Sequence, residues 1–171
     1  MKIIAATFLL LISSTTLAAA PYQTTNDFLI ETFEINIPES STLWIGKEKK
    51  AVIENILQHK ARFIRVRYWQ KGLTTAWVLN EVGKEKPITV GIVIHNKKIQ
   101  RLKVLAFRES RGWEVRHNFF TQQFKHIGLN SESDDYQLDK PIDGISGATL
   151  SVRALRKIAR IALYLESGTT L

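Results

Sequence analysis

Two very short turns, at residues 70–72 and 96–97, divide the middle of the chain into closely spaced apolar segments. Apolar residues alternate with arginines through residues 64–68, and a mostly apolar run occupies residues 88–94. Alternation with a period of two is the pattern of a half-buried strand, and turns this short join neighbouring antiparallel strands. We therefore predict an antiparallel meander of at least four strands.

Helical spacing of apolar residues predicts helices before and after this meander. One covers residues 47–59, a second follows the aromatic side chains of residues 119–124, and a third covers residues 151–165, where an apolar face lies opposite a basic one. Residues 26–37 are interpreted instead as an extended segment that Pro38 ends. The predicted fold class is α+β, with an antiparallel sheet of at least four strands and helices packed against it in a single domain.

The first residues of the chain have the order of a secretory signal peptide. Lys2 precedes an apolar stretch at residues 3–12, and hydroxyl residues and a run of alanines follow. The apolar stretch is shorter than the roughly 20 residues that a membrane-spanning helix needs, which favours cleavage after one of residues 18–20 over an uncleaved membrane anchor. We expect residues 1–20 to be a signal peptide, residues 21–171 to be the domain, and the protein to be periplasmic or otherwise exported.

Composition narrows the class of partner. The chain has no cysteine, which rules out disulfides and a lipid-modified N-terminal cysteine, and its formal net charge is +8. The basic residues are spread over strands and helices rather than gathered in an arm or tract, and export also argues against nucleic acid as a partner. An acidic partner protein, an anionic membrane surface and a merely solvated basic surface all stay open.

The most unusual stretch is the turn of small residues at 143–149, DGISGAT, directly before the last helix. A helix start presents unpaired backbone N–H groups and a partial positive charge, which suit an anion such as phosphate. Glycines permit close approach to the backbone, Thr149 and Ser151 would place hydroxyls at the mouth, and Arg153 and Arg156 could neutralise bound charge. The pattern indicates a phosphate-bearing ligand, with a plain Ser/Thr helix cap after a glycine turn as the alternative.

Well-known nucleotide and hydrolase motifs do not fit this turn. The sequence contains neither G-x-x-x-x-G-K-[ST] nor G-x-G-x-x-G. The serine-hydrolase elbow G-x-S-x-G also fails, because Ala148 stands where its last glycine is needed.

The stretch DGISGATLS closely resembles the flavinylation motif of the FMN-binding domain family. These are periplasmic covalent-flavin domains of the sodium-pumping NADH:quinone reductase, of the Rnf electron-transfer complex and of smaller exported proteins. The family motif is Asp, two variable residues, Ser or Thr, Gly, Ala or Ser, then Ser or Thr. The residues that match are Asp143, Ser146, Gly147, Ala148 and Thr149, with Gly144 at a variable position. The resemblance implies that a flavin transferase joins FMN to Thr149 through a phosphoester.

A second region strengthens the resemblance. VLAFRESRGWEV, followed by FFTQQFKHIGL, is similar to the family's strand, its Glu-Ser/Thr-x-Gly loop, and an aromatic helix that ends in Gln-Phe and a glycine. The matching residues are Glu109, Ser110, Gly112, Gln123, Phe124 and Gly128, while Arg111 stands where members often carry Pro. The resemblance covers roughly residues 90–158, inside a motif-bearing part of about 88–165.

The resemblance also implies that four residues of the second region lie at the cofactor: Glu109, Ser110, Gly112 and Trp113. Ordinary turn hydrogen bonding is the alternative role for Glu109 and Ser110, and simple packing is the alternative role for Trp113. By the same patterns, Phe119, Phe120 and Phe124 are expected in the hydrophobic core.

As a function, the resemblance implies an exported flavoprotein with covalent FMN that carries electrons between respiratory or other redox partners, either soluble or membrane-bound. We expect a carrier rather than an enzyme with its own substrate, and no residue is assigned as catalytic or as a metal ligand. His95, His117 and His126 lack metal-ligand spacing. The alternative is a non-redox basic binding module, or an accessory module of a membrane complex, in which the turn is only a cap.

Overall fold

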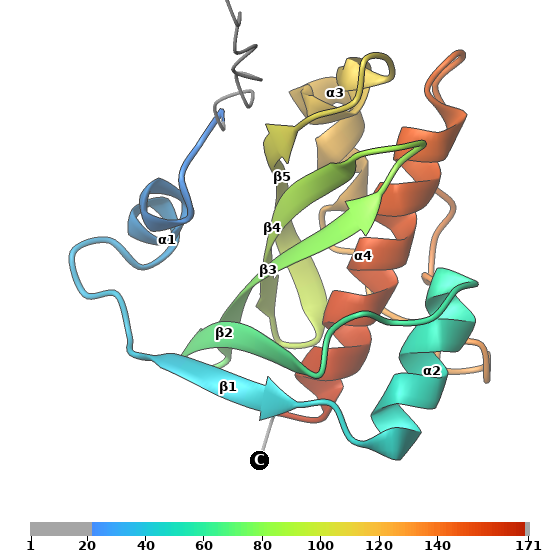
Figure 1. Cartoon of the computed structure of the whole chain (residues 1–171). Helices are drawn as coiled ribbons and strands as arrows, with labels where there is room; N and C mark the ends of the chain where they lie inside the picture. The colour runs from blue at the N-terminus through green and yellow to red at the C-terminus, as the bar shows by residue number, and fades with distance from the viewer. Residues whose placement is uncertain (1–21, 170–171) are drawn as a thin grey trace, which may run out of the picture.

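The computed structural model describes residues 22–169, and within them five antiparallel strands form one sheet. Each strand lies beside its neighbour in sequence, in the order β1-β2-β3-β4-β5 (Figure 1). The strands are β1 (Ser40–Trp44), β2 (Arg65–Lys71), β3 (Thr74–Val82), β4 (Pro87–His95) and β5 (Lys98–Phe107). The α+β fold class and the antiparallel meander are confirmed. The signal peptide predicted at residues 1–20 lies outside the described residues.

The backbone at the two tight turns explains the register of the meander. Lys71 pairs with Thr74, and Gly72 at the first position of the intervening loop has φ +58°. His95 pairs with Lys98, and both intervening residues, 96 and 97, have positive φ, as a two-residue type I′ turn requires. Such turns fit the twist of the paired strands, so they fix which residues of each strand face the core.

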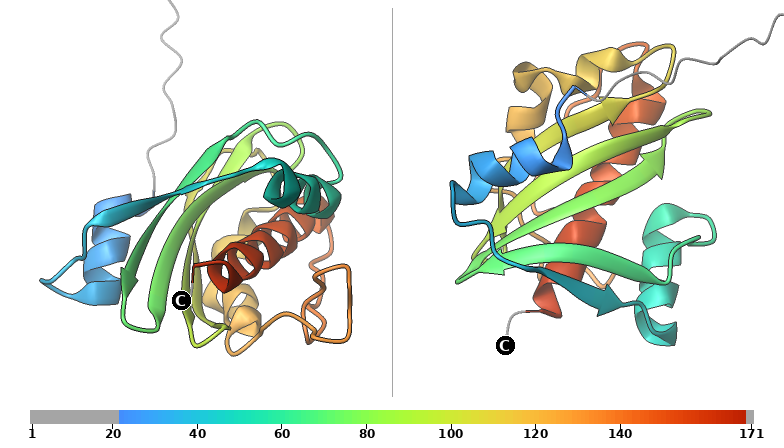
Figure 2. Two further views of the ribbon diagram at one scale, coloured as in Figure 1. Left: turned by 90° about the horizontal axis from the view of Figure 1, so that it is seen from below. Right: turned by 60° about the vertical axis from the view of Figure 1, so that its left-hand side comes forward.

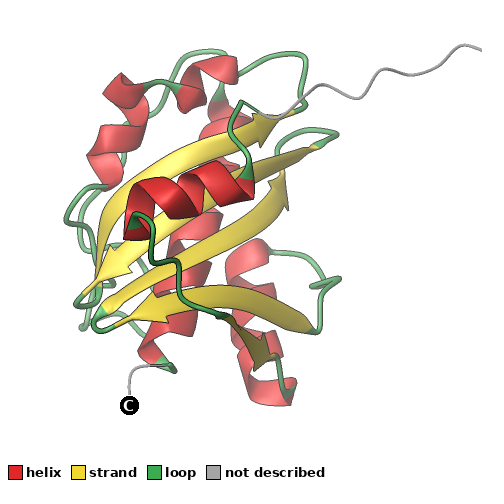
Figure 3. Ribbon diagram, turned by 90° about the vertical axis from the view of Figure 1, so that its left-hand side faces the viewer, coloured by secondary structure: helices red, strands yellow, loops and turns green. Residues whose placement is uncertain are grey.

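Helices cover both faces of the sheet and make three layers (Figure 2). The long helix α4 (Thr149–Ser167) and α2 (Lys47–Leu57) lie on one face, over the main core, which contains the fully buried Trp77, Phe120 and Phe124. The helix α1 (Thr25–Phe33) lies across the opposite face (Figure 3). The predicted helices at residues 47–59 and 151–165 are therefore confirmed, within a few residues at their ends.

The prediction of an extended segment at residues 26–37 is wrong for most of its length, because Thr25–Phe33 forms the helix α1. Thr24 and Asp27 make a capping box in which the Thr24 side chain accepts from the Asp27 N–H at 3.1 Å and the Asp27 carboxylate accepts from the Thr24 N–H at 3.3 Å. Phe28 is fully buried on the sheet, where a Cβ at Gly91 would approach its ring to 2.8 Å. Capping and burial together outweigh the local preference for extended chain.

Strand β1 was not predicted, because its sequence carries little periodic signal. It is an edge strand whose side chains are mostly exposed, so apolar and polar residues do not alternate along it. Pairing with β2, from Ser40 opposite Trp69 to Trp44 opposite Arg65, fixes its conformation instead.

The aromatic stretch after β5 forms three short helical pieces rather than one helix. They are η1 (Trp113–Arg116), α3 (Asn118–Thr121) and η2 (Gln122–Phe124). Phe120 and Phe124 enter the main core as expected, but Phe119 is 56% exposed, so the prediction that Phe119 is a core residue is wrong. Among the described residues, no helix has the length and apolar character needed to cross a membrane.

Candidate functional site

Three segments that are distant in sequence meet at the N-terminal end of α4, at the top of Figure 1. They are the β3–β4 turn at residues 83–86, the loop of residues 108–112 after β5, and the turn of residues 143–149. We call the second the Glu109 loop and the third the Thr149 turn. The Glu109 loop and the Thr149 turn, one from each stretch that carries the family resemblance, therefore lie at one end of the molecule.

The Thr149 turn is closed by its own backbone. The Ala148 N–H donates to the Ile145 carbonyl at 3.0 Å, and Gly147, the third residue of this four-residue turn, has φ +81°. A type II turn needs positive φ at that position, and glycine adopts it without strain. Ile142 is buried and holds the beginning of the turn on the core, while Ala148 is buried at its end.

Thr149 is the first residue of α4 and its side chain is exposed. The N-cap position belongs to Ala148, and no side chain among residues 22–169 caps the helix. The alternative prediction of a Ser/Thr helix cap is therefore wrong, and the Thr149 hydroxyl is not used in capping.

The first turn of α4 also contains backbone N–H groups that can donate hydrogen bonds to a ligand. The Val152 N–H bonds to the Ala148 carbonyl at 3.0 Å, but within residues 22–169 no partner is found for the N–H groups of Thr149, Leu150 and Ser151. These donors and the positive end of the helix dipole suit an anion on the Thr149 side chain. Arg153 is one turn further on the same exposed stripe, about 6 Å along the axis.

Ser151 does not lie at the mouth, contrary to the prediction. It is 4% exposed and faces the Glu109 loop. A Cβ at Gly112 would approach the Ser151 Oγ to 2.5 Å and the Ala148 Cα to 3.5 Å, and Gly112 itself has φ +82°. Glycine at 112 thus lets the Glu109 loop lie directly against the start of α4.

Glu109 joins the Glu109 loop to the β3–β4 turn. Its carboxylate accepts hydrogen bonds from the backbone N–H groups of Lys84, Glu85 (2.7 Å) and Lys86 (2.9 Å). Partial burial by itself raises the pKa of this carboxyl, but the three backbone donors and the nearby Lys84 charge hold the pKa of Glu109 below its ordinary value. The carboxylate therefore binds the turn, and Ser110 beside it is exposed.

Gln123 links the aromatic helical pieces to the Thr149 turn. Its side-chain oxygen accepts from the Asp143 N–H at 2.8 Å, which fixes the point where the turn begins. The two residues of the family's Gln-Phe pair therefore have different roles: Phe124 packs in the core, and Gln123 binds the Thr149 turn.

Trp113 is half-exposed beside the Glu109 loop. The Arg116 guanidinium lies 5.0 Å from its ring centre, and the His117 ring meets it edge-on at 5.1 Å. With the exposed Phe119, whose ring is stacked against His117 at 6.2 Å, these residues form an aromatic surface near the end of the molecule that holds Thr149.

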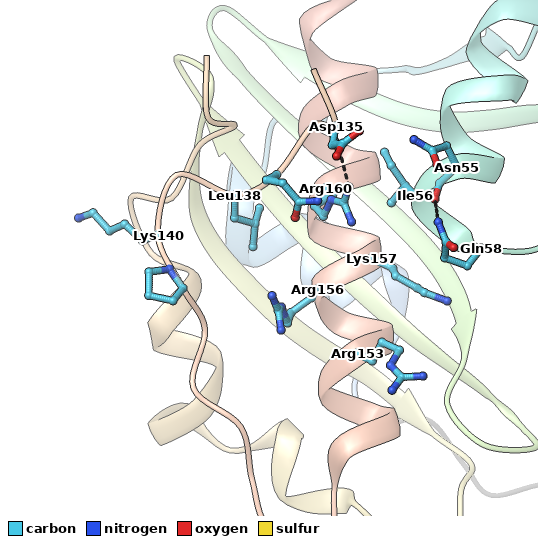
Figure 4. Close-up of a pocket in the computed structure, with 12 residues that line it drawn as sticks. Asn55, Ile56, Gln58, Asp135, Leu138, Lys140, Arg153, Arg156, Lys157 and Arg160 are labelled. Carbon is cyan, nitrogen blue, oxygen red and sulfur yellow. Dashed lines mark hydrogen bonds between the residues drawn. The ribbon is translucent and has the colours of Figure 1, made fainter. Parts of the chain in front are cut away.

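The sequence did not identify a basic groove beside the Thr149 turn. It runs along the outward face of α4 and has a volume of about 590 Å³ (Figure 4). Arg153 and Arg156 were named from sequence as possible phosphate partners, but Lys140, Lys157 and Arg160 were not. The helical spacing of residues 153, 156, 157 and 160 indicates a basic face, whereas only the folded loop brings Lys140 to it.

Comparison with known protein families gives a match over the second half of the chain. Residues 83–164 match the family described as the FMN-binding domain, a span that begins just after β3 and ends within α4. It contains both the Glu109 loop and the Thr149 turn. No curated protein and no solved structure matches the chain. Residues 83–164, just under half of the chain, therefore belong to the FMN-binding domain family.

Proposed function

We propose that this protein is an exported flavoprotein that carries FMN as a phosphoester on Thr149 and works as an electron carrier. The observation that carries the proposal is the position of Thr149 in a chain of this family. Its hydroxyl is exposed on the first residue of a long helix, and no cap uses it.

The residues around Thr149 fit a phosphoryl group attached there. The N–H groups of the first helical turn point outward from the helix start, and Arg153 is on the same stripe. A Cβ at Gly147 or at Gly144 would meet no atom of the described residues within 4 Å, so the turn leaves space for a flavin transferase to reach the hydroxyl. FMN, once attached, supplies the redox chemistry, and the chain binds and orients it.

Export gives a physical reason for a covalent bond. A flavin that dissociates outside the cytoplasm is lost to dilution, whereas a tethered one stays at high effective concentration at its site. The partners that follow from this function are a flavin transferase for maturation and redox donor and acceptor proteins, soluble or membrane-bound.

The test is intact mass and in-gel flavin fluorescence of exported protein co-expressed with a flavin transferase. We expect wild type to gain the mass of FMN less one water and to fluoresce after denaturation. Thr149→Val, which removes the hydroxyl but keeps the shape, should gain nothing, whereas Thr149→Ser and Ser146→Ala should both be modified. Modification that persists in Thr149→Val would show that FMN is attached to another residue. Wild type that stays unmodified would contradict the proposal.

A second candidate function rests on the basic groove. In it the protein is a non-redox binding or accessory module that recognises an anionic partner, and five cationic side chains along one groove favour it. Protein of this kind would stay colourless and unmodified in the same co-expression experiment, so that experiment separates the two.

A further inference from the structure

The basic groove has a floor and two walls. The floor is the outward face of α4, one wall is the end of α2, and the other is the loop of residues 135–141 (Figure 4). Five cations and one carboxylate line it: Lys140, Arg153, Arg156, Lys157, Arg160 and Asp135. A groove with this imbalance of charge attracts anions.

Two of these cations hold the walls in place. Arg160 donates from Nε to the Tyr136 carbonyl at 2.8 Å and from its terminal nitrogen to the Asp135 carbonyl. Lys157 donates to the Leu57 carbonyl at the end of α2 and lies 3.5 Å from the Glu81 carboxylate. Both walls are therefore tied to the floor helix by hydrogen bonds, so the groove is a fixed feature of the fold.

The other three cations have no such role. Within the described part of the chain, no ion pair or hydrogen bond is found for the heads of Lys140, Arg153 and Arg156. Burial lowers the pKa of Arg160, the Asp135 carboxylate opposes this, and Arg156 lowers it further. Arg156 and Arg160, one turn apart on the floor helix, thus repel one another, and an anion bound between the walls would relieve that repulsion.

We propose that the basic groove binds a small phosphate-bearing molecule, with Arg153, Arg156 and Lys140 holding the phosphate. Arginine pairs with phosphate through two parallel N–H donors, and lysine adds a point charge. The groove volume of about 590 Å³ lies in the range of small-molecule sites and well exceeds what inorganic phosphate fills. The amide of Gln58 and the apolar side chain of Leu138 would contact the rest of the ligand.

The groove is bordered on both sides, which favours a compact ligand over an acidic polypeptide. The phosphate belongs either to a free metabolite or to a lipid headgroup, because both present the same anion to the arginines. This inference shares Arg153 with the surroundings of Thr149 but goes beyond the proposed function, since neither Thr149 nor its modification takes part in it.

The test is calorimetric titration at about 0.15 M salt, where distant surface charges are screened. The probes are adenosine monophosphate, adenosine as the phosphate-free control, vesicles with and without phosphatidylglycerol, and a poly-glutamate peptide. We expect wild type to bind either the monophosphate or the anionic vesicles saturably, which also identifies the source, and to ignore adenosine. The Arg153→Gln/Arg156→Gln double variant, which keeps both wall-holding cations, should bind at least tenfold more weakly.

The matched control is Arg62→Gln/Arg67→Gln, which removes the same charge from exposed residues outside the groove. It should bind within twofold of wild type, as should Thr149→Val. Equal weakening by both double variants would reduce the effect to net charge and overturn the site. Failure of both phosphate probes, or saturable binding of a poly-glutamate peptide alone, would also overturn it, whatever the result of the flavin experiment.

Discussion

The two loops at the start of α4 both carry the family resemblance, yet they are built in opposite ways. The Glu109 loop is closely packed, with Gly112 against Ser151 and the Glu109 carboxylate bound to three backbone N–H groups. The Thr149 turn is open, and added Cβ atoms at its two glycines would meet nothing within 4 Å. The Glu109 loop packs against the start of α4, whereas the Thr149 turn leaves the start of α4 exposed.

The difference shows that a glycine in a motif can have more than one physical cause. Gly112 combines positive φ with close approach of another segment, Gly147 has positive φ alone, and Gly144 has neither. Substitution by alanine at these three positions therefore gives a graded test of the comparison, in which only the first is a packing residue.

The largest effect is expected for Gly112→Ala. Its Cβ would lie 2.5 Å from the Ser151 Oγ, and alanine is strained at φ +82°. Overpacking and left-handed backbone together should lower the free energy of unfolding by roughly 3 kcal/mol. Urea denaturation measures the change, and a loss below about 0.5 kcal/mol would mean that the two loops are not packed as described.

Ser151→Ala supplies the control for Gly112→Ala. It removes the Oγ and leaves the Cβ at 3.3 Å, so the packing part of the strain should be relieved while the backbone part stays. In a double-mutant cycle, Gly112→Ala should then lower the free energy of unfolding by only about 1 kcal/mol. Purely additive effects would show that Ser151 is not the obstacle.

The second prediction concerns pH and Glu109. Because the pKa of Glu109 is lowered in the folded protein, its stabilisation is present above the unfolded pKa and is lost as pH falls through the folded pKa. Glu109→Gln should lower the free energy of unfolding by about 1 kcal/mol at pH 7, discounted for solvent, and the difference from wild type should shrink in acid. Urea denaturation between pH 7 and pH 3 measures it.

Glu85→Gln is the control for Glu109→Gln. Glu85 is on the same turn, and its exposed carboxylate pairs with Lys84 at the surface, at 3.3 Å. This variant should lie within about 0.5 kcal/mol of wild type at pH 7. A gap between Glu109→Gln and wild type that persists undiminished in acid would contradict a role for the Glu109 charge.

Much of the fold could be predicted from the sequence because its signals are local. Alternation through residues 64–68 and the two-residue turn at 96–97 set the meander, and the apolar face of residues 151–165 set α4. Local sequence did not predict α1, although Thr24 and Asp27 form a capping box at its start. Its helix depends on Phe28 reaching Gly91, a contact far away in sequence.

The candidate site shows the same division. Thr149 is found from its neighbours alone, because a small-residue turn before an amphipathic helix is a local pattern. Ser151 was misplaced because only the approach of Gly112 shows which way that side of the helix faces. Lys140 lines the basic groove because Arg160 binds the loop of residues 135–141 to α4. No short sequence pattern predicts that contact.

The third prediction concerns Gly147→Ala, which tests the cost of the left-handed backbone conformation without a packing contact. With φ +81° and an open surrounding, alanine should lower the free energy of unfolding by about 1 kcal/mol. Because the same turn positions Thr149, flavin loading by a transferase should also slow in this variant, measured as fluorescence against time. Unchanged stability would mean that the turn relaxes to a conformation with negative φ.

The smallest effect is expected for Gly144→Ala, which tests whether openness alone needs glycine. A Cβ at this position meets nothing within 4 Å, and the residue is outside the left-handed region, so neither packing nor backbone strain opposes alanine. Stability should stay within about 0.5 kcal/mol of wild type, or rise slightly because alanine restricts the unfolded chain.

Flavin loading of Gly144→Ala separates two reasons for glycine at this position. If Gly144→Ala is stable and loads normally, glycine is dispensable there. If it is stable but loads slowly, the transferase itself needs the bare backbone, and the openness of the Thr149 turn is a recognition feature rather than a consequence of its fold.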